Sequence, residues 1–395
     1  MKNIPYSRQS IDKKDIKEML KVLSSNWITQ GPKINEFEAD LCKFTGAKYA
    51  VVVANGTAAL HCACIAAEIE KDDYAITSPF SFAASANCVL YCGGNPLFSD
   101  IQPDTFNIDP DKIRELLFKH RSSNKTKIKA IIPVHYAGHP CELDIIKKIA
   151  DAHDCFVIED AAHALGATFK GTKIGSCAYS DMTIFSFHPV KHITTGEGGA
   201  ILTNNKEHYK KLLLVRNHGI TKESNSLINK DMKDCGWYYE MQSIGFNYRI
   251  TDFQSALGIS QLKKCSRFLD LRRKIAKSYQ DAFIGNHFFD IPVERENVKS
   301  SYHLYPIKLK EKYINKRKLI FNNMRSNGLG VQIHYIPIHL QPFYQNKFGY
   351  KAGNYPIAEN IYKRVISLPV FPGMSKKDVQ RIVKITYKVF ESLGS

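Results

Sequence analysis

The stretch KYAVVVANGTAALHCACIAAEI (residues 48–69) decides the fold class. An unbroken apolar run with strand composition passes into a helix-forming run, with only Asn55-Gly56-Thr57 at the junction. Apolar runs of the same kind follow at 73–79, 129–136, 155–162, 181–187 and 199–204, and a helical pattern covers 142–154. Apolar runs that alternate with helices predict an α/β fold, with a mostly parallel sheet covered on both faces. Such sheets bind ligands at the carboxyl ends of their strands.

The pattern changes after about residue 250. Residues 251–283 indicate one long helix or two abutting helices, and short strands and helices follow, including SYHLYPIKL (301–309), a helical 316–328 and VQIHYIPI (331–338). With 395 residues, 44% of them hydrophobic, the chain can bury a sizeable core. We therefore expect a large domain over 1–250 and a smaller C-terminal α/β domain over 251–395.

Composition narrows the function classes. The ten cysteines form no CxxC pair and no histidines follow at zinc spacing, so no metal site is expected. No run of about twenty apolar residues is present, and the first twenty residues lack the apolar core of a signal peptide. We expect a cytoplasmic protein without a membrane partner. The net charge of +17 suits nucleic acid, anionic lipid or anionic metabolites, but no nucleic-acid-binding motif supports the first.

Two glycine-containing segments could hold phosphate. TTGEGGA (194–200) is neither a P-loop nor a dinucleotide-binding fingerprint, because a strand rather than a helix follows it. Gly56 and Thr57 lie where a strand meets a helix, and free N–H groups at a helix N-terminus bind anions. An ordinary helix cap explains the same residues.

Asp160 and Lys191 are the residues with the clearest chemical potential. Asp160 ends the apolar strand CFVIED, which places its carboxylate over the ligand crevice, although a helix cap or a buried ion pair fits equally well. Lys191 follows the strand TIFSF and Ser186, and a glycine-rich turn comes after it. A lysine beside an apolar or cationic wall has a lowered pKa and becomes a nucleophile, whereas most lysines are simply surface residues.

Eight ordered segments give a more specific indication. They are WITQGP (27–32), ANGTAAL (54–60), SPFSFAASAN (78–87), IEDAAHALGA (158–167), FSFHPVKHITTGEGGA (185–200), GFNYRITDFQSALG (245–258), HYIPI (334–338) and LPVFPGMS (368–375). In this order they resemble the nucleotide-sugar aminotransferases of the DegT/DnrJ/EryC1/StrS family over nearly the whole chain. The resemblance implies the aspartate aminotransferase fold, that is, fold type I of the enzymes that use pyridoxal 5'-phosphate (PLP).

The resemblance also implies roles for single residues. Lys191 would hold PLP as a Schiff base, and Asp160 would keep its pyridine nitrogen protonated, which makes the ring an electron sink. The other expected cofactor contacts are Gly56, Thr57 and Ser186 at the phosphate, Phe82 stacked on the ring, and His163 near the ring hydroxyl. His163 stands where many members carry glutamine, and a buried structural histidine is the alternative. Asn247 would reach the cofactor phosphate of a neighbouring subunit, which implies a homodimer with shared active sites.

Within the family, the chain is most similar to the PseC-type branch of pseudaminic acid biosynthesis. That likeness implies L-glutamate as the amino donor and C4 of a UDP-linked 4-keto-6-deoxy-N-acetylated sugar as the acceptor. The expected sugar-nucleotide contacts are Tyr6, Trp27, Thr29, Gln332, His334 and Tyr335. Ordinary packing of these side chains, and another nucleotide-linked keto sugar such as a bacillosamine, perosamine or aminoarabinose precursor, remain alternatives.

Two rival functions belong to other classes. PLP-dependent sugar dehydratases of this family carry histidine in place of the lysine, so the presence of Lys191 argues against dehydration. A non-catalytic regulator or nucleic-acid binder with the same fold agrees with the positive charge, but no motif supports it.

Overall fold

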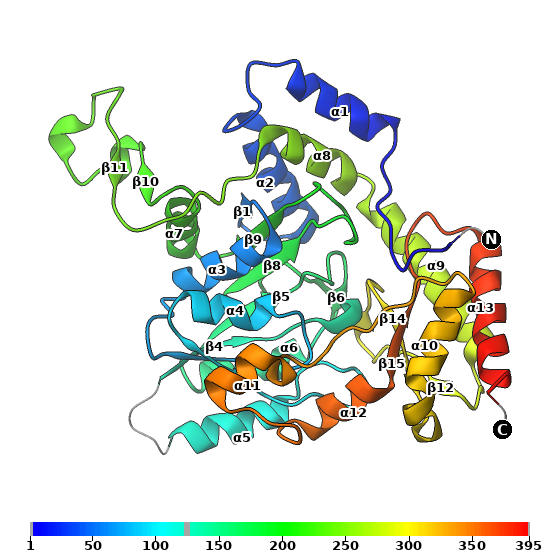
Figure 1. The fold of residues 1–395 in the computed structure, drawn as a ribbon. Coiled ribbons are helices and arrows are strands. Elements are labelled where there is room, and N and C mark those ends of the chain that lie inside the picture. Colours follow the sequence, from blue (N-terminus) through cyan, green and yellow to red (C-terminus); the bar gives the residue numbers. More distant parts are fainter. Residues whose placement is uncertain (1–2, 122–126, 394–395) are drawn as a thin grey trace.

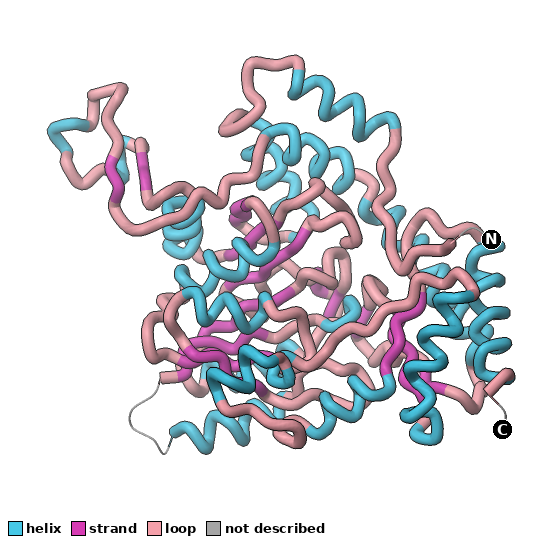
Figure 2. The backbone as a smooth tube through the Cα atoms, in the orientation of Figure 1, coloured by secondary structure: helices cyan, strands magenta, loops and turns pink. Residues whose placement is uncertain are grey.

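The structure, a computed structural model, describes residues 3–121 and 127–393 (Figure 1). Its centre is a seven-stranded sheet, drawn in magenta in Figure 2. In spatial order the strands are β1 (Tyr49–Val53), β9 (Gly199–Thr203), β8 (Met182–Ser186), β5 (Phe156–Asp160), β4 (Ile128–Ile132), β2 (Tyr74–Thr77) and β3 (Asn95–Phe98). All adjacent pairs are parallel except those that β9 makes with β1 and β8. The prediction of a mostly parallel sheet is confirmed.

Helices cover both faces of this sheet because the side chains of each strand alternate between two cores. In β1, Val52 belongs to one core, whereas Val51 and Val53 belong to the other. The core of Val52 is closed by α2 (Pro32–Thr45), α5 (Pro110–Arg121), α6 (Leu143–Asp151) and α8 (Asp252–Leu262). The opposite core is closed by α3 (Gly56–Ala66), α4 (Ala84–Tyr91) and α7 (Lys206–Arg216).

A smaller sheet lies beside the large one, to its right in Figure 1. It consists of β12 (Phe289–Asp290), β14 (Tyr305–Leu309) and β15 (Val365–Leu368). Its core includes residues of α9 (Cys265–Phe283), α10 (Arg317–Ser326) and α13 (Lys376–Glu391). Residues 251–283 thus form two abutting helices, the second of the predicted alternatives. Apolar residues of α8 and early α9 join the core of the large sheet, and the domain boundary at residue 250 stays a prediction.

The segment VQIHYIPI is extended but forms no strand, which differs from the expectation. Its ladder contact is a single bridge between Gln332 and Ser367, and Pro337 cannot donate a backbone hydrogen bond. Two short helices, α11 (Pro342–Phe348) and α12 (Pro356–Arg364), connect this segment to β15. The extended segment therefore runs as a strap. Val331 is buried in the core of the small sheet, whereas Tyr335 packs against the cluster that contains Phe80 and Tyr136.

The chain start joins the two sheets. Ile4 forms a bridge with Leu329 in the small core, and the Tyr6 carbonyl accepts a hydrogen bond from the Val370 amide at 3.2 Å. The Ser7 hydroxyl then donates to the carbonyl oxygen of Val190 at 3.1 Å. Helix α1 (Lys13–Leu23) follows and packs on α8. The first residues thus contact both the small core and the loop that carries Lys191.

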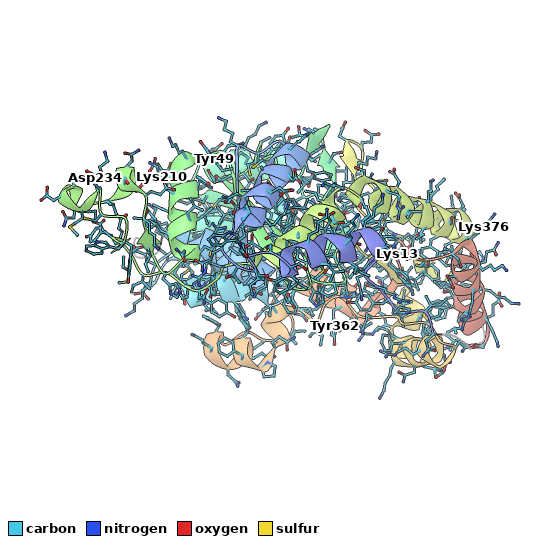
Figure 3. All side chains as sticks on the ribbon, turned by 90° about the horizontal axis from the view of Figure 1, so that it is seen from above. Lys13, Tyr49, Lys210, Asp234, Tyr362 and Lys376 are labelled. Atoms are coloured by element: carbon cyan, nitrogen blue, oxygen red, sulfur yellow. The ribbon has the colours of Figure 1, made fainter. Side chains whose placement is uncertain are left out.

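Two small strand groups complete the fold. One contains β6 (Thr168–Phe169), β7 (Thr172–Lys173) and β13 (Val298–Lys299). The other pairs β10 (Ile220–Thr221) with β11 (Glu240–Met241) in an arm, residues 219–244, that projects from the body, with Asp234 near its tip in Figure 3. None of the helices in the described ranges is long and apolar enough to cross a membrane.

Candidate active site

The site forms where β5 and β8 end. These neighbouring strands are parallel, with Asp160 opposite Ile184, so their carboxyl ends meet at one edge of the sheet. Asp160 is the last residue of β5 and Ser186 the last of β8. Lys191 lies five residues further on, in the loop between β8 and β9. The topology therefore brings together the two residues that the sequence marks as chemically active.

Hydroxyl and amide donors hold the Asp160 carboxylate in place. Its side chain is only 5% exposed. One carboxylate oxygen accepts a hydrogen bond from the Ser85 hydroxyl at 2.6 Å, and the other accepts from the Ala162 amide at 3.2 Å. Ser81 in turn pairs with Ser85 at 2.8 Å. These donors fix the direction of the buried carboxylate.

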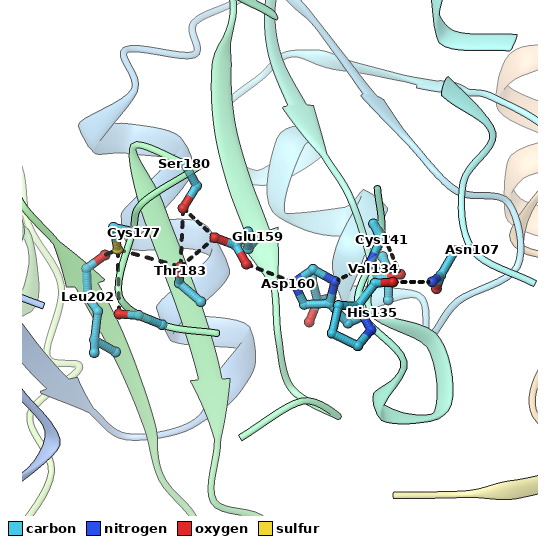
Figure 4. Close-up of polar contacts among 12 residues, drawn as sticks. Asn107, Val134, His135, Cys141, Glu159, Asp160, Cys177, Ser180, Thr183 and Leu202 are labelled. Atoms are coloured by element: carbon cyan, nitrogen blue, oxygen red, sulfur yellow. Dashed lines mark hydrogen bonds and ion pairs between the residues drawn. The ribbon is translucent and has the colours of Figure 1, made fainter. Parts of the chain in front are cut away.

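The preceding carboxylate, Glu159, anchors the same strand on its other side (Figure 4). It accepts hydrogen bonds from the Ser180 and Thr183 hydroxyls and pairs with His135 Nε2 at 2.8 Å. His135 Nδ1 accepts from the Cys141 amide at 3.1 Å, so Nε2 is the nitrogen that donates to Glu159. Every polar group of this buried network has a partner, which gives Asp160 a rigid base.

Lys191 has an amine suited to nucleophilic attack. Burial lowers its pKa to about 8 from the ordinary value of 10.5, the nearby Asp160 charge raises it, and the Arg272 charge lowers it further. Arg272 itself is fully buried on α9 and donates to the carbonyl oxygens of Tyr302, His303 and Val370. A substantial fraction of Lys191 is therefore neutral near physiological pH, as a nucleophile or general base requires.

The N-terminus of α3 forms a close cradle with the end of β8. A Cβ atom at Gly56 would lie 2.9 Å from Ser186 Cβ, and one at Gly199 would lie 2.5 Å from the Asn55 carbonyl oxygen. Asn55, the residue before Gly56, caps the helix by accepting from the Ala58 amide at 2.8 Å. The first helical residues, Gly56 and Thr57, keep amide groups that the cap does not satisfy. Gly56, Thr57 and Ser186 thus offer donors for an anion.

Residues of the strap at 331–338 line a further side of the site. The Tyr335 hydroxyl pairs with His163 Nε2 at 3.1 Å, and His334 Nδ1 pairs with the Ser367 hydroxyl at 2.9 Å. The Tyr6 ring lies 5.5 Å from that of His334, and the Phe82 ring 6.3 Å from that of Tyr335, measured between centroids. Phe82 is 61% exposed, so its face is open to a ligand.

Three buried histidines, His163, His192 and His303, have neighbouring imidazole rings next to the strap. The ring centroids of His163 and His303 are 4.2 Å apart, and those of His192 and His303 are 5.5 Å apart. Burial lowers the pKa of all three well below 6.5, and the positive charges of Lys191 and Arg272 act in the same direction on His303. They are neutral side chains at physiological pH.

Several predicted residues lie apart from this constellation. Trp27 and Thr29 are exposed on the connection between α1 and α2, where Thr29 forms a bridge with Thr251. Asn247 is exposed at the base of the arm and forms a bridge with Asn217. Gln332 is partly buried, and its backbone pairs with Ser367. The predicted roles of these residues stay predictions.

The structure adds residues that the sequence did not single out, chiefly Ser85, His303 and Arg272. Ser85 lies in SPFSFAASAN, three residues after Phe82, and its position on the first turn of α4 was the available signal. Nothing in the sequence indicated that Arg272 or His303 would approach Lys191. Within the described ranges, no group of three or more His, Cys, Asp or Glu side chains could hold a metal ion.

Comparison with known proteins agrees with this geometry. A profile described as the DegT/DnrJ/EryC1/StrS aminotransferase family matches residues 9–386. The spore coat polysaccharide biosynthesis protein SpsC of Bacillus subtilis is 38% identical, covering 96% of this chain and 95% of its own length. A Campylobacter jejuni protein named UDP-4-amino-4,6-dideoxy-N-acetyl-beta-L-altrosamine transaminase is 39% identical over 99% of this chain and 98% of its own.

A solved structure extends the likeness to three dimensions. Helicobacter pylori PseC, an aminotransferase involved in the biosynthesis of pseudoaminic acid, superposes with a TM-score of 0.90 and 35% identity. The superposition covers 99% of this chain and all of that one. The predicted aspartate aminotransferase-like fold is confirmed by these matches. With its family profile, relatives and fold in agreement, the chain belongs to the DegT/DnrJ/EryC1/StrS aminotransferase family and is an enzyme of the transaminase class.

Proposed function

We propose that this enzyme uses PLP to move an amino group from L-glutamate to C4 of a UDP-linked 4-keto-6-deoxy-N-acetylated sugar, in pseudaminic acid biosynthesis. The observation that carries the proposal is the convergence of Lys191, with its pKa of about 8, and the buried Asp160 at one edge of the sheet. A lysine that forms a Schiff base and a carboxylate for the pyridine nitrogen are the two groups that PLP chemistry requires of a protein.

The residues at the site fit PLP. Gly56 leaves room that a Cβ atom would fill, beside Ser186 and at a helix N-terminus that favours a phosphate group. His163 Nδ1 is buried without a hydrogen-bond partner among the described residues, so it can serve a polar ligand atom. The open face of Phe82 can cover an aromatic ring. These features support the assignment of Lys191, Asp160, Gly56, Thr57, Ser186, Phe82 and His163 as cofactor contacts.

When bound, PLP would supply an electron sink that stabilises negative charge at the carbon losing a proton. Asp160 would keep the pyridine nitrogen protonated, and the Ser85 hydroxyl would hold Asp160 in that orientation. The freed Lys191 amine would take the proton from Cα of the amino acid and deliver it on the cofactor side, which needs its neutral form. In the second half-reaction Lys191 would move a proton in the opposite direction, so that the amino group reaches the keto sugar.

The choice of sugar rests on the relatives. The altrosamine transaminase of C. jejuni supports an amino-sugar product, and the role of H. pylori PseC supports the pseudaminic acid pathway. Tyr6, His334 and Tyr335 contact one another or His163 and are the residues that we expect to meet the sugar. The similar identity to SpsC, named for spore coat polysaccharide, favours a second candidate: another nucleotide-linked keto sugar. Both candidates share the cofactor chemistry and differ in the acceptor.

We further propose a homodimer with shared active sites. The arm exposes large apolar side chains, among them Ile228, Trp237 and Ile244, each of them more than 70% exposed. A cluster of exposed apolar side chains is characteristic of a protein interface. Asn247 lies at the base of this arm and is exposed, so a second subunit can present it to a cofactor phosphate.

A spectroscopic half-reaction tests the proposal. PLP-loaded protein is mixed with L-glutamate, and the visible cofactor band is followed; UDP-linked 4-keto-6-deoxy-N-acetylated sugars are then added one at a time. We expect the band to disappear with glutamate and to return with the pseudaminic acid precursor. The Lys191→Ala variant should form no such band, whereas Lys377→Ala, at an exposed lysine on α13, should behave like the wild type.

The outcomes separate the parts of the proposal. Return of the band with a different keto sugar would replace the acceptor and leave the transaminase assignment intact. Loss of the band with glutamate but no return with any sugar would refute the sugar class. A wild-type protein that binds no PLP, or a Lys191→Ala variant with substantial turnover, would refute the role of Lys191.

A further inference from the structure

Tyr335 and His163 form a hydrogen-bonded pair close enough to Lys191 for its charge to act on His163. The Tyr335 hydroxyl lies 3.1 Å from His163 Nε2, and His163 is only 5% exposed. The other ring nitrogen, Nδ1, has no partner among the residues that the structure describes. Burial lowers the pKa of His163 well below 6.5, and the charge of Lys191 lowers it further. His163 therefore carries a single ring proton, and its hydrogen bond with Tyr335 determines which of the two nitrogens holds that proton.

The hydrogen-bond count favours one arrangement. Burial raises the pKa of Tyr335 well above its ordinary value, so the phenol keeps its proton. If Tyr335 donates to Nε2, both atoms of the pair are satisfied and Nδ1 carries the imidazole proton. If Nε2 donates to the phenol oxygen instead, the phenol proton needs another acceptor, and the described residues provide none. In that arrangement Nδ1 is an acceptor, and it too has no donor. The first arrangement leaves one group unsatisfied and the second leaves two.

The surroundings limit what can satisfy Nδ1. The His303 ring lies against His163 with centroids 4.2 Å apart and planes 35° from parallel, so it covers a face of the imidazole and cannot accept a proton in the ring plane. Nδ1 and Nε2 lie on different edges of the ring, so the N–H at Nδ1 points away from Tyr335. A bound molecule with an acceptor oxygen is the partner that this geometry lacks.

We propose that Tyr335 is a positioning residue that fixes His163 as the Nδ1–H tautomer, which makes this N–H a donor to the ring oxygen of bound PLP. The inference rests on the proposed function for its ligand and assigns Tyr335 a role in the cofactor site rather than in sugar binding alone. The opposite tautomer would turn a nitrogen lone pair toward a negatively charged oxygen and repel it. A histidine at this position thus depends on its hydroxyl partner, because either ring nitrogen can hold the proton.

Histidine nitrogen NMR tests the tautomer without the cofactor. Protein labelled with ¹⁵N in its histidines is compared with the Tyr335→Phe variant, and His163→Gln identifies the signals of His163. We expect the wild type to show protonated Nδ1 and unprotonated Nε2, and the variant to show averaged signals of two tautomers. A wild type with protonated Nε2, or a variant with unchanged signals, would overturn the proposal.

The chain provides a matched control for this measurement. Tyr248 pairs with Nδ1 of the buried His61 at 3.2 Å, also through a tyrosine hydroxyl. Tyr248→Phe should change the signals of His61 and leave those of His163 as in the wild type. A change at His163 in this control as well would mean that the signals report a general loosening rather than the lost hydroxyl, and the assignment of Tyr335 would fail.

The visible band of PLP-loaded protein tests the consequence. A hydrogen bond donated to the ring oxygen would lower the affinity of that oxygen for the proton that it would share with the Lys191 nitrogen. Tyr335→Phe should therefore raise the midpoint pH of the band by about one unit, the effect of losing one hydrogen bond to a charged oxygen. The same change in a His163→Gln background should have no effect on the midpoint, because an amide always offers an N–H.

The two measurements separate the proposal from the function on which it rests. An unshifted midpoint in Tyr335→Phe, or an equal shift in the His163→Gln background, would refute the link between Tyr335, His163 and the cofactor. If the wild type forms no visible band with PLP, the proposed function fails, while the nitrogen signals still decide whether Tyr335 sets the tautomer.

Discussion

Replacing Gly56 with alanine tests the anion cradle at the start of α3. The new Cβ would lie 2.9 Å from Ser186 Cβ and 3.1 Å from Ser186 Oγ, well inside the 3.5–4.0 Å of a normal carbon contact. Overpacking of this kind costs about 1–3 kcal/mol. Displacement of the helix start should also remove a hydrogen bond to the phosphate of PLP, worth about 1.5–3 kcal/mol for a charged acceptor, or a tenfold or greater loss of affinity.

Two assays separate these effects. Thermal unfolding of the cofactor-free Gly56→Ala variant should show the steric cost, and spectrophotometric titration should show the weaker PLP binding. Gly236→Ala is the matched control, because a Cβ there meets nothing within 4 Å. Adding Ser186→Gly, which removes the colliding Cβ, should restore stability but not PLP affinity. If Gly56→Ala unfolds and binds PLP like the wild type, α3 does not hold the phosphate.

Three further outcomes follow from the site and the arm. Because burial lowers the pKa of Lys191 to about 8, the rate of PLP capture by cofactor-free protein should rise with pH and level off above that value; a midpoint near 10.5 would contradict this. Ser85→Ala removes the 2.6 Å hydrogen bond to Asp160 and should weaken PLP binding about tenfold in a titration, whereas an unchanged dissociation constant would deny Ser85 its role. Ile244→Lys should dissociate the proposed dimer in sedimentation velocity, while Ile284→Lys, at a similarly exposed position, should not; a dimeric Ile244→Lys variant would exclude the arm from the interface.

The sequence was sufficient for the fold class and for the centre of the site. Apolar runs such as 155–162 and 181–187 are buried on both faces of a sheet, and this pattern depends only on local residue type. Asp160 and Lys191 could be identified because Asp160 ends one such strand and Lys191 lies in the loop after the next, so the topology of parallel strands brings them to one edge of the sheet. The choice of PLP and of transamination needed the ordered family segments as well, since a lysine near a carboxylate is not specific.

The contacts made across long sequence separations could not be read from local patterns. The partnership of Ser85 with Asp160 spans 75 residues and that of Tyr335 with His163 spans 172 residues. Residues 331–338 were expected in the small α/β domain, and Val331 does lie in the small core, but the contact of Tyr335 with His163 could not be predicted. The burial of Arg272 could not be predicted either, because the charge composition does not indicate which arginine becomes buried.

The path of the first seven residues has a consequence for movement. Ile4 is anchored in the small core, and Ser7 is tied to Val190, the residue before Lys191. Any displacement of the small core relative to the large sheet would therefore pull directly on the loop that carries the reactive amine. The position of the reactive amine is thus linked to the small core through a connection of only a few residues.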